Sequence, residues 1–245
     1  MSDIIHADFF NKIRTVQILS VLSGSGISTA SGIPTFRGKN GLWKNYSAEE
    51  LANYEAFLRN PQLVWEWYTW RKNIIKKVQP TYAHYALVKL ENYFSEVFVI
   101  TQNVDNLHTL AGSKNVIELH GNIIRSKCSQ CQIPYVEEFD PLQKIPTCHH
   151  CGSLIRPDVV WFGESLPIAA LQNAEKNITG SDMLLVIGTS GIVEPAASLP
   201  FLAKSSGVYV AEINPEPTPL SPYADKWFQM SADQFCKILL DKFNH

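Results

Sequence analysis

Short apolar segments alternate with segments of helical periodicity along most of this 245-residue chain. The apolar segments are brief, which is typical of strands buried on both faces of a parallel sheet. The helical segments between them can provide the crossovers that parallel strands need. The pattern predicts an α/β fold with a doubly wound parallel sheet. The predicted strands are residues 18–23, 97–101, 116–119, 183–188, 208–213 and 226–228, and the predicted helices are residues 81–93, 168–177, 195–205 and 232–243.

Two segments do not follow this alternation, and we assign them to a smaller domain inserted into the larger one. Residues 38–78 are rich in aromatic residues and helix formers, which predicts a helical module, and residues 124–156 contain four of the five cysteines. The large domain then comprises residues 1–37, 79–123 and 157–245. With 45% hydrophobic residues, a chain of this length can bury a substantial core.

The charge balance argues against a polyanionic partner. The chain has 21 Lys and Arg residues against 23 Asp and Glu residues, without a long run of one sign, so we expect neither nucleic acid nor a membrane as a partner. No run of about 18 apolar residues occurs, and the first residues lack the pattern of an export signal. We therefore expect a soluble, cytoplasmic protein that is a monomer.

Four cysteines form two C-x-x-C pairs separated by sixteen residues. In a reducing compartment this arrangement favours a metal over disulfides, and the spacing matches a zinc ribbon whose four thiolates fill a structural, tetrahedral site. His149 and His150 could ligate, but the tetrahedron is already full. A ribbon that binds nucleic acid is the alternative, although the loop between the pairs is acidic, the wrong sign for phosphate. The predicted zinc ligands are Cys128, Cys131, Cys148 and Cys151.

A glycine-rich turn, Gly24-Ser25-Gly26-Ile27-Ser28, follows the first predicted strand. Such glycines allow a tight turn that brings backbone N–H groups to a pyrophosphate at a helix N-terminus. Ordinary turns also use glycine, so the motif alone leaves nucleotide binding open. The acidic residue that holds the adenosine ribose about twenty positions after a dinucleotide motif is replaced here by the inserted domain. A nucleotide would therefore be held differently than in a dehydrogenase.

A second polar motif follows the strand at residues 97–101 and includes Gln102, Asn103 and Asp105. Ligands in open α/β sheets bind at the carboxyl ends of the strands, so these side chains are candidate ligand contacts. The alternative is that Asn103 or Asp105 caps the following helix. We interpret His108, within that helix, as structural.

His120 lies just past the strand at residues 116–119, again at a carboxyl end. An isolated histidine is more often a structural residue than a catalytic one. Three polar loops that converge on one crevice reverse that expectation, and His120 becomes a candidate catalytic residue.

Taken together, these motifs resemble those of sirtuins, which are NAD-dependent protein lysine deacylases. The resemblance implies a Rossmann-like large domain and a small domain made of a zinc ribbon and a helical module, with NAD and an acylated lysine of a protein between them. It also implies that nicotinamide is released and that the acyl group leaves lysine as O-acyl-ADP-ribose. The matching segments are residues 24–37, 101–105, 119–121, 156–164, 188–190 and 213–214, together with the four cysteines.

The resemblance also assigns roles to single residues. His120 is the expected general base on the ribose hydroxyls, a role that suits a side chain titrating near neutrality, and Asn103 is the second expected catalytic residue. The expected cofactor-binding residues are Gly24, Ser25, Gly26, Ser28, Thr35, Phe36, Arg37, Gln102, Asn103, Asp105, Gly188, Thr189, Ser190, Asn214 and Ala232. The expected peptide-binding residues are Val160, Trp161, Phe162, Gly163 and Glu164, which with residues 191–194 would pair with the substrate backbone as added strands.

One branch of the family, which removes acidic acyl groups, has a tyrosine and an arginine three positions apart, and Tyr68 and Arg71 match them. On a helix these two side chains share a face. Arginine can bind a carboxylate through two parallel hydrogen bonds, tyrosine adds a hydroxyl donor, and succinyl or malonyl lysine ends in such a carboxylate. Ala48 matches the small residue that leaves room for the longer acyl chain. The alternative is an aromatic-rich helix packed in a core, with Arg71 on a solvated flank.

Two residues depart from the commonest family pattern. Ser25 stands where alanine is usual, and Thr35 where aspartate is common; the acidic-acyl branch resembles this chain at Thr35. The predicted function is removal of succinyl and malonyl groups, with some deacetylation. The alternatives are an enzyme that mainly removes acetyl groups, and a mono-ADP-ribosyltransferase or NAD hydrolase. A nucleotide-sensing module would tolerate loss of His120, and a zinc-ribbon interaction protein would leave the polar loops unexplained.

Overall fold

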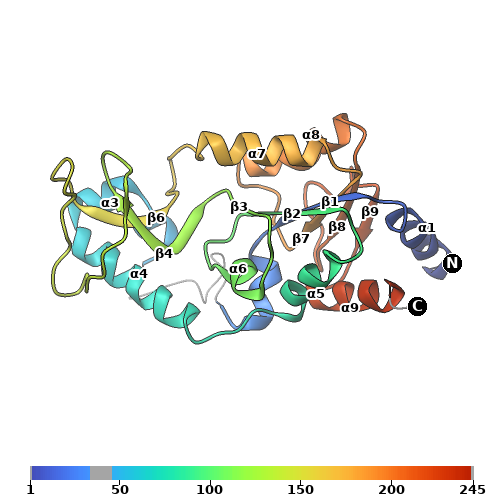
Figure 1. The fold of residues 1–245 in the computed structure, drawn as a ribbon, viewed down its shortest axis with the longest axis horizontal. Helices are drawn as coiled ribbons and strands as arrows, with labels where there is room; N and C mark the ends of the chain where they lie inside the picture. Colours follow the sequence, from blue (N-terminus) through green and yellow to red (C-terminus); the bar gives the residue numbers. More distant parts are fainter. Residues whose placement is uncertain (1, 34–45, 244–245) are drawn as a thin grey trace.

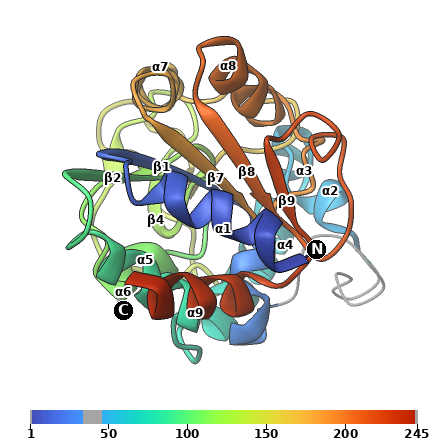
Figure 2. The ribbon, with the colours of Figure 1, turned by 90° about the vertical axis from the view of Figure 1, so that its right-hand side faces the viewer.

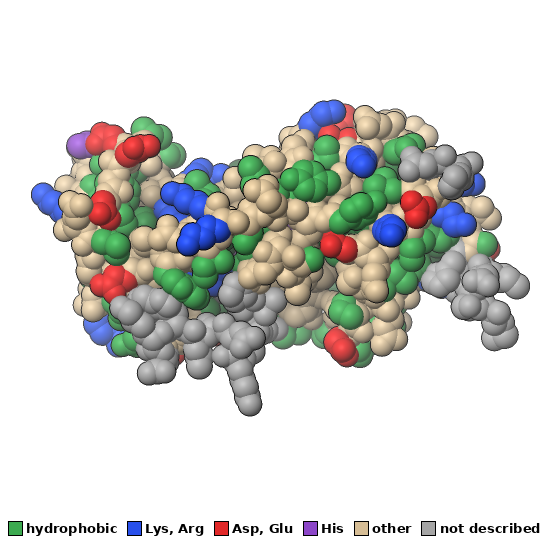
Figure 3. Space-filling model, turned by 90° about the horizontal axis from the view of Figure 1, so that it is seen from below, with side chains coloured by type: hydrophobic (Ala, Val, Ile, Leu, Met, Phe, Trp, Pro, Cys, Tyr) green, Lys and Arg blue, Asp and Glu red, His purple; other side chains and the backbone are tan. Residues whose placement is uncertain are grey.

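The computed structural model describes residues 2–33 and 46–243. Three predicted cofactor-binding residues, Thr35, Phe36 and Arg37, lie outside the described residues. The chain forms two lobes: an α/β lobe and, at the opposite end of the molecule, a smaller lobe (Figure 1). None of the described helices combines the length and apolar character required to cross a membrane. On the face shown in Figure 3, basic, acidic and apolar side chains of the described residues are interspersed.

A parallel sheet with the strand order β3-β2-β1-β7-β8-β9 forms the centre of the large lobe. The chain runs outward from β1 in one direction and from β7 in the other, which opens a crevice at the carboxyl ends of these two strands. The predicted doubly wound sheet is confirmed, with every strand bound within one residue of the expectation. The strands are β1 (Ile18–Ser23), β2 (Glu96–Thr101), β3 (Val116–Glu118), β7 (Met183–Ile187), β8 (Tyr209–Ile213) and β9 (Lys226–Phe228).

Helices cover both faces of this sheet (Figure 2). On one face, α1 (Ser2–Ile13), α5 (Tyr82–Leu90) and α9 (Ala232–Phe243) bury apolar side chains against the strands. On the other face, α7 (Ile168–Thr179) and α8 (Leu199–Ser205) do the same.

Helix α1 is an element that the sequence pattern did not predict. Its Phe9 ring lies 4.8 Å from the Phe228 ring and 6.0 Å from the Phe235 ring, all three buried. The helix is therefore stabilised by contacts with the C-terminal end of the chain, which local periodicity does not report.

The small lobe combines an antiparallel sheet with three helices. Its sheet has the order β5-β4-β6, and its helices and strands share one buried apolar cluster, which we call the small-lobe core. The sheet runs from Gly121 to Val159, three residues beyond the predicted ribbon segment 124–156 at each end. The elements are α2 (Ala48–Leu51), α3 (Tyr54–Arg59), α4 (Pro61–Ile75), β4 (Gly121–Cys128), β5 (Pro134–Tyr135) and β6 (Ile155–Val159).

Local sequence fixes where α4 begins. The side chain of Asn60 accepts a hydrogen bond from the Leu63 N–H at 3.1 Å, and Pro61 occupies the first turn, where its missing N–H costs nothing. The helix then runs long enough to carry both Tyr68 and Arg71 on its buried face.

Candidate active site

A cavity of about 270 Å³ lies where the carboxyl edge of the large sheet meets the small lobe. Its lining comes from the turns after β1, β2, β3 and β7, from α2 and α4, and from the segment after β6. Fourteen of the predicted site residues line it. They are Gly24, Ser25, Tyr68, Arg71, Gln102, Asn103, His120, Val160, Trp161, Phe162, Gly163, Glu164, Thr189 and Ser190.

The glycines after β1 allow two turns to pack backbone against backbone. A Cβ on Gly24 would lie 2.7 Å from Thr189 Cα, and a Cβ on Gly26 would lie 2.6 Å from Gly188 Cα. The Gly24 N–H donates to the Ile187 carbonyl at 3.0 Å, and the Gly26 N–H donates to the Gly188 carbonyl at 2.8 Å. These two N–H groups therefore join the turn after β1 to the turn after β7.

Two amide side chains after β2 tie the same turns together. Gln102 Nε2 donates to Thr189 Oγ1 at 2.9 Å. Asn103 Nδ2 donates to the Gly24 carbonyl at 3.1 Å and to Ser28 Oγ at 3.2 Å. Both residues line the cavity, so hydrogen bonds to the surrounding loops hold in place the polar groups that a ligand would meet.

Asp105 lies behind this layer and does not line the cavity. One carboxylate oxygen accepts from Ser28 Oγ at 2.6 Å, and the other accepts from the Leu107 N–H at 3.0 Å. The second bond reaches the first residue of α6 (Leu107–Ala111), but the N-cap of this helix is Asn106, so Asp105 is not the capping residue that the alternative supposed. Burial raises the pKa of this carboxyl, while the Ser28 hydroxyl, the Leu107 N–H and the charge of Arg71 act in the opposite direction.

His120 has a defined tautomer. Its Nδ1 lies 2.8 Å from the Gln102 carbonyl oxygen, and because a carbonyl can only accept, Nδ1 carries the proton. Nε2 is therefore the basic nitrogen of a ring that lines the cavity. Burial lowers the pKa of His120, although the bond to Gln102 opposes this, and the ring is neutral at pH 7. The geometry gives a nitrogen base beside the amides of Gln102 and Asn103.

Tyr68 and Arg71 project into the same cavity from α4, with exposed fractions of only 2% and 7%. Tyr68 Oη accepts a hydrogen bond from Trp161 Nε1 at 2.8 Å, and the Arg71 guanidinium lies 5.4 Å from the centre of the Trp67 ring. Burial raises the pKa of Tyr68 well above its usual value, so the phenol keeps its proton. The alternative of a core helix holds for Trp65 and Trp67, which are buried, but Arg71 is not on a solvated flank.

Besides the four cysteines, seven of the predicted site residues that the structure describes lie outside the cavity lining: Gly26, Ser28, Asp105 and Gly188, which pack behind it, and Ala48, Asn214 and Ala232. Ala48 is buried in the small-lobe core, and Ala52, one turn later, lines the cavity in its place. Asn214 donates from Nδ2 to the Thr189 carbonyl at 2.8 Å, one layer behind the lining. Ala232 begins α9 and is buried against the large sheet.

The segment after β6 is fixed from both sides. The Val160 N–H donates to the His120 carbonyl at 2.9 Å, and the Phe162 N–H donates to the Ala52 carbonyl at 2.9 Å. The Phe162 side chain is 49% exposed at the cavity mouth, whereas the Trp161 side chain is 2% exposed. Backbone of this segment is thus presented to the cavity while one of its large side chains points back into the protein.

Five cavity-lining residues were not singled out by sequence: Glu49, Ala52, Val104, Val159 and Leu166. Val104 and Val159 are adjacent in the chain to the predicted site residues Asn103 and Val160, so their positions in the sequence could have indicated them. Glu49 lies in α2 with Ala48, and Ala52 directly follows that helix, so only the orientation of this segment decides which residues face the cavity. No sequence signal marks Leu166.

The four cysteine sulfurs lie within 4.8 Å of one another, with Cys128 and Cys151 at 3.3 Å and Cys131 and Cys148 at 3.6 Å. Zinc with Zn–S bonds of about 2.3 Å requires sulfurs about 3.8 Å apart at the corners of a tetrahedron, so the cluster fits a structural zinc ion. Backbone N–H groups support thiolates here, and the Ser153 N–H is the main cause that lowers the pKa of Cys151 to about 6. His149 pairs with Glu137 instead, at 3.0 Å.

The sequence profile of the Sir2 family, the sirtuins, matches residues 24–195. The chain belongs to the Sir2 family. One curated Sir2 relative, "NAD-dependent protein deacylase 1" of Caldanaerobacter subterraneus subsp. tengcongensis, is 54% identical over 232 residues, which are 94% of this chain and 96% of the relative. The "NAD-dependent protein deacylase" of Aquifex aeolicus is 52% identical over 221 residues, which are 90% and 92% of the two chains.

Solved structures of Sir2 proteins have the same fold. A Sir2 homolog in complex with NAD superposes with a TM-score of 0.91 at 44% identity, over 97% of this chain and 93% of its own. A Sir2 protein with a p53 peptide and NAD+ superposes with a TM-score of 0.84 at 33% identity, over 97% and 98% of the chains. The family resemblance that the sequence predicted is confirmed.

Proposed function

We propose that this Sir2 protein is an NAD-dependent protein-lysine deacylase that removes succinyl and malonyl groups in preference to acetyl groups. The observation that carries the preference is that Tyr68 and Arg71 line the same cavity as His120 and Asn103. The names of its curated relatives support the deacylase activity. The acyl preference rests on the chemistry of the two side chains from α4.

The residues at the sheet edge fit NAD. The crevice lies at the point where the strand order reverses, which is where open α/β sheets bind nucleotides. Polar side chains of Gln102, Asn103, Thr189 and Ser190 gather there beside Ser25. Bound NAD would supply the ADP-ribose that accepts the acyl group, with release of nicotinamide.

His120 would act as the general base. Its protonated Nδ1 is held by the Gln102 carbonyl, which leaves Nε2 to take a proton from a hydroxyl within hydrogen-bond reach. The pKa lowered by burial keeps the ring neutral, and therefore basic, at physiological pH. Asn103 would orient the reacting end of the cofactor with an amide that the Gly24 carbonyl and Ser28 hold in place.

Tyr68 and Arg71 would bind the free carboxylate of the acyl group. A guanidinium can donate two parallel hydrogen bonds to a carboxylate, and the buried phenol can donate one more. Both groups are shielded from water, which strengthens charged hydrogen bonds and makes an acetyl group, with no carboxylate, a poorer match. The backbone of residues 160–163 and 191–194 would pair with the substrate peptide on either side.

The test is turnover of one peptide sequence carrying acetyl, malonyl, succinyl or glutaryl lysine, with NAD, by the wild-type protein and by Arg71→Met. We expect the acidic acyl groups to be removed best, and Arg71→Met to lower kcat/KM for succinyl lysine by about 10- to 100-fold, because hydrogen bonds to a charged group are lost. Deacetylation should change little.

Lys72→Met is the matched control, because it removes a positive charge from the next residue of α4. The Lys72 ammonium lies 5.1 Å from the centre of the Trp65 ring and is not part of the cavity lining. Deacetylation equal to or better than desuccinylation in the wild type, with no effect of Arg71→Met, would overturn the acidic-acyl preference.

A further inference from the structure

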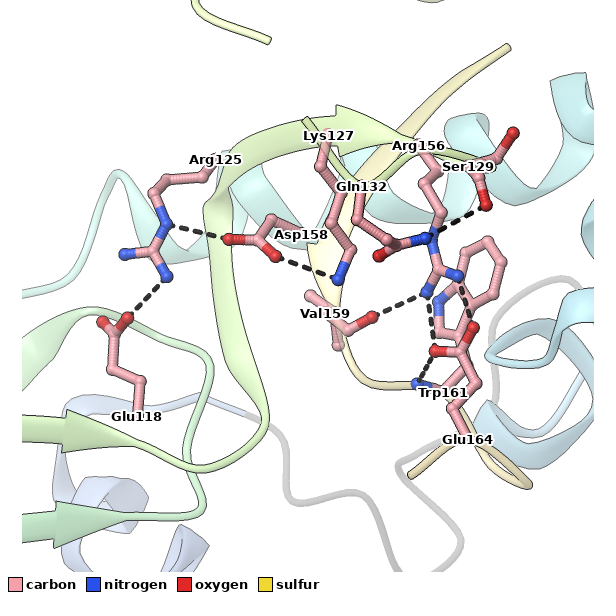
Figure 4. Close-up of polar contacts among 10 residues, drawn as sticks. All are labelled: Glu118, Arg125, Lys127, Ser129, Gln132, Arg156, Asp158, Val159, Trp161 and Glu164. Atoms are coloured by element: carbon pink, nitrogen blue, oxygen red, sulfur yellow. Dashed lines mark hydrogen bonds and ion pairs between the residues drawn. The ribbon is translucent and has the colours of Figure 1, made fainter. Parts of the chain in front are cut away.

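Two residues expected to contact the substrate peptide use their side chains inside the protein instead. The Trp161 indole packs in the small-lobe core, with its ring centre 5.3 Å from that of Phe57. The Glu164 carboxylate accepts from the Trp161 N–H at 2.8 Å and is bonded to Arg156. Figure 4 shows the contacts of Glu164 with Arg156 and with the Trp161 backbone. Trp161 and Glu164 also line the cavity together with Tyr68.

Arg156 forms the base of this arrangement. It is 1% exposed, and its two terminal nitrogens meet the two carboxylate oxygens of Glu164 in a bidentate pair, with Nη2 2.9 Å from Oε2. Nη2 also donates to the Val159 carbonyl at 2.7 Å. The guanidinium carbon lies 3.3 Å from the centre of the Trp161 ring. Because Glu164 neutralises its charge, Arg156 contributes orientation of the indole rather than charge in the cavity.

The indole in turn sets the direction of the Tyr68 hydroxyl. Indole nitrogen can only donate, so in the 2.8 Å contact Tyr68 Oη is the acceptor. A phenol has a single proton, and with its oxygen occupied by the indole N–H that proton must point elsewhere. Tyr68 lines the cavity, and burial keeps the hydroxyl protonated by raising its pKa.

We infer that Trp161 is a positioning residue for acyl-group selectivity: held by the Arg156–Glu164 pair, its indole N–H turns Tyr68 into a hydrogen-bond donor aimed at the acyl carboxylate. This rests on the proposed function, because it assigns a role only if a carboxylate binds beside Tyr68. In this role Trp161 acts through Tyr68.

The variant Trp161→Phe tests the inference, since it keeps an aromatic ring in the core and removes the N–H donor together with part of the indole volume, a loss that the control variant shares. Steady-state kinetics are measured on succinyl and acetyl forms of one peptide. We expect KM for the succinyl peptide to rise by about five- to tenfold, the effect of one lost hydrogen bond in the ground state, with kcat nearly unchanged. The ratio of kcat/KM for succinyl over acetyl falls by the same factor.

Trp65→Phe is the matched control. Trp65 is a fully buried indole on the same helix as Tyr68, and its Nε1 donates to the Ile155 carbonyl at 3.0 Å rather than to Tyr68. The Trp65→Phe variant should lower the melting temperature at least as much as Trp161→Phe does, and it should leave the succinyl-to-acetyl ratio of kcat/KM unchanged. An equal fall of that ratio in both variants would reduce Trp161 to a packing residue and overturn the inference.

A double-mutant cycle gives the second criterion. Tyr68→Phe removes the hydroxyl, so adding Trp161→Phe to it should lower the ratio no further. Additive effects of the two changes would contradict a route through Tyr68. The proposed function and the role of Trp161 can be tested separately. A wild-type protein without succinyl preference contradicts the proposed function. A wild-type preference that Trp161→Phe leaves intact contradicts only the role of Trp161.

Discussion

The two walls of the cavity are held in place by different kinds of contact. On the large-lobe wall, His120 is oriented by the main-chain carbonyl of Gln102, and Asn103 by the main-chain carbonyl of Gly24 together with the Ser28 hydroxyl. On the small-lobe wall, Tyr68 is oriented by another side chain, Trp161, which is itself oriented by an ion pair of side chains. The sheet sets the positions of the main-chain carbonyls, so these positions tolerate substitution of side chains. Contacts made by side chains change with each substitution. A protein built this way can keep its chemistry constant while its acyl preference varies.

The cores behind the two walls differ as well. The large-lobe side chains stand at the ends of strands covered by helices on both faces, with two apolar clusters in support. Among the residues that the structure describes, the small lobe has one apolar cluster, which includes Cys128 and Cys148 together with Tyr68 and Trp161. The small-lobe wall should therefore depend on zinc, and the large-lobe wall should not.

Zinc removal should give the largest effect, and it should disrupt only the small-lobe wall of the cavity. Chelation under mild denaturant should abolish deacylation of every acyl peptide, because loss of a structural zinc ion releases the core that holds Tyr68 and Trp161. Far-ultraviolet circular dichroism should retain most of the helical signal of the large lobe, and added zinc should restore activity. Full activity in protein shown to be metal-free would contradict this.

Loss of the base on the other wall should come next. His120→Ala should lower deacylation by about 10²- to 10⁴-fold, and by a similar factor for acetyl and succinyl peptides, since it removes the proposed general base and leaves the proposed acyl site intact. Nicotinamide release and peptide deacylation are both measured. His149→Ala, which removes an exposed histidine paired with Glu137, is the control and should be active. A strongly unequal loss for the two acyl groups would contradict the division between the walls.

The pH dependence of kcat/KM should give the smallest effect, and it tests the large-lobe wall through His120. Because burial lowers the pKa of His120, the ring gains its second proton at a lower pH than an ordinary histidine does, and kcat/KM should decline as pH drops through the lowered pKa. The acid limb should thus have its midpoint below 6.5, measured with the acetyl peptide so that no substrate carboxylate titrates. A midpoint above 6.5 would contradict a neutral, buried base. Tyr68, with its raised pKa, should add no alkaline limb below pH 10.

Much of the large lobe could be predicted because its signals are local. Each buried strand is a short apolar run, and β7, whose five residues are all buried, is the plainest example. Polar residues directly after such runs, such as Asn103 and His120, fall at the carboxyl edge by the geometry of a parallel sheet. Helix α1 was not predicted because its Phe9 packs against Phe228 and Phe235, which lie more than two hundred residues away in the chain.

The glycines and Ala48 show the limit of motif matching. Gly24 and Gly26 allow close packing against the backbone of Gly188 and Thr189, a contact between two turns that the glycine motif alone does not indicate. Ala48 begins α2 and Ala52 directly follows it, and only the packing of this segment decides that Ala52 faces the cavity.

By itself the sequence determined the strands, the four zinc ligands, the polar loops with His120, and the pairing of Tyr68 with Arg71 on one helical face. Each of these follows from spacing within a short segment, where covalent geometry fixes which side chains can meet. The tertiary structure alone decided that this helical face and the strand ends share one cavity, and that the Trp161 indole points back to Tyr68, 93 positions away in the chain. Contacts of that range depend on how two lobes pack, and no local pattern records the packing.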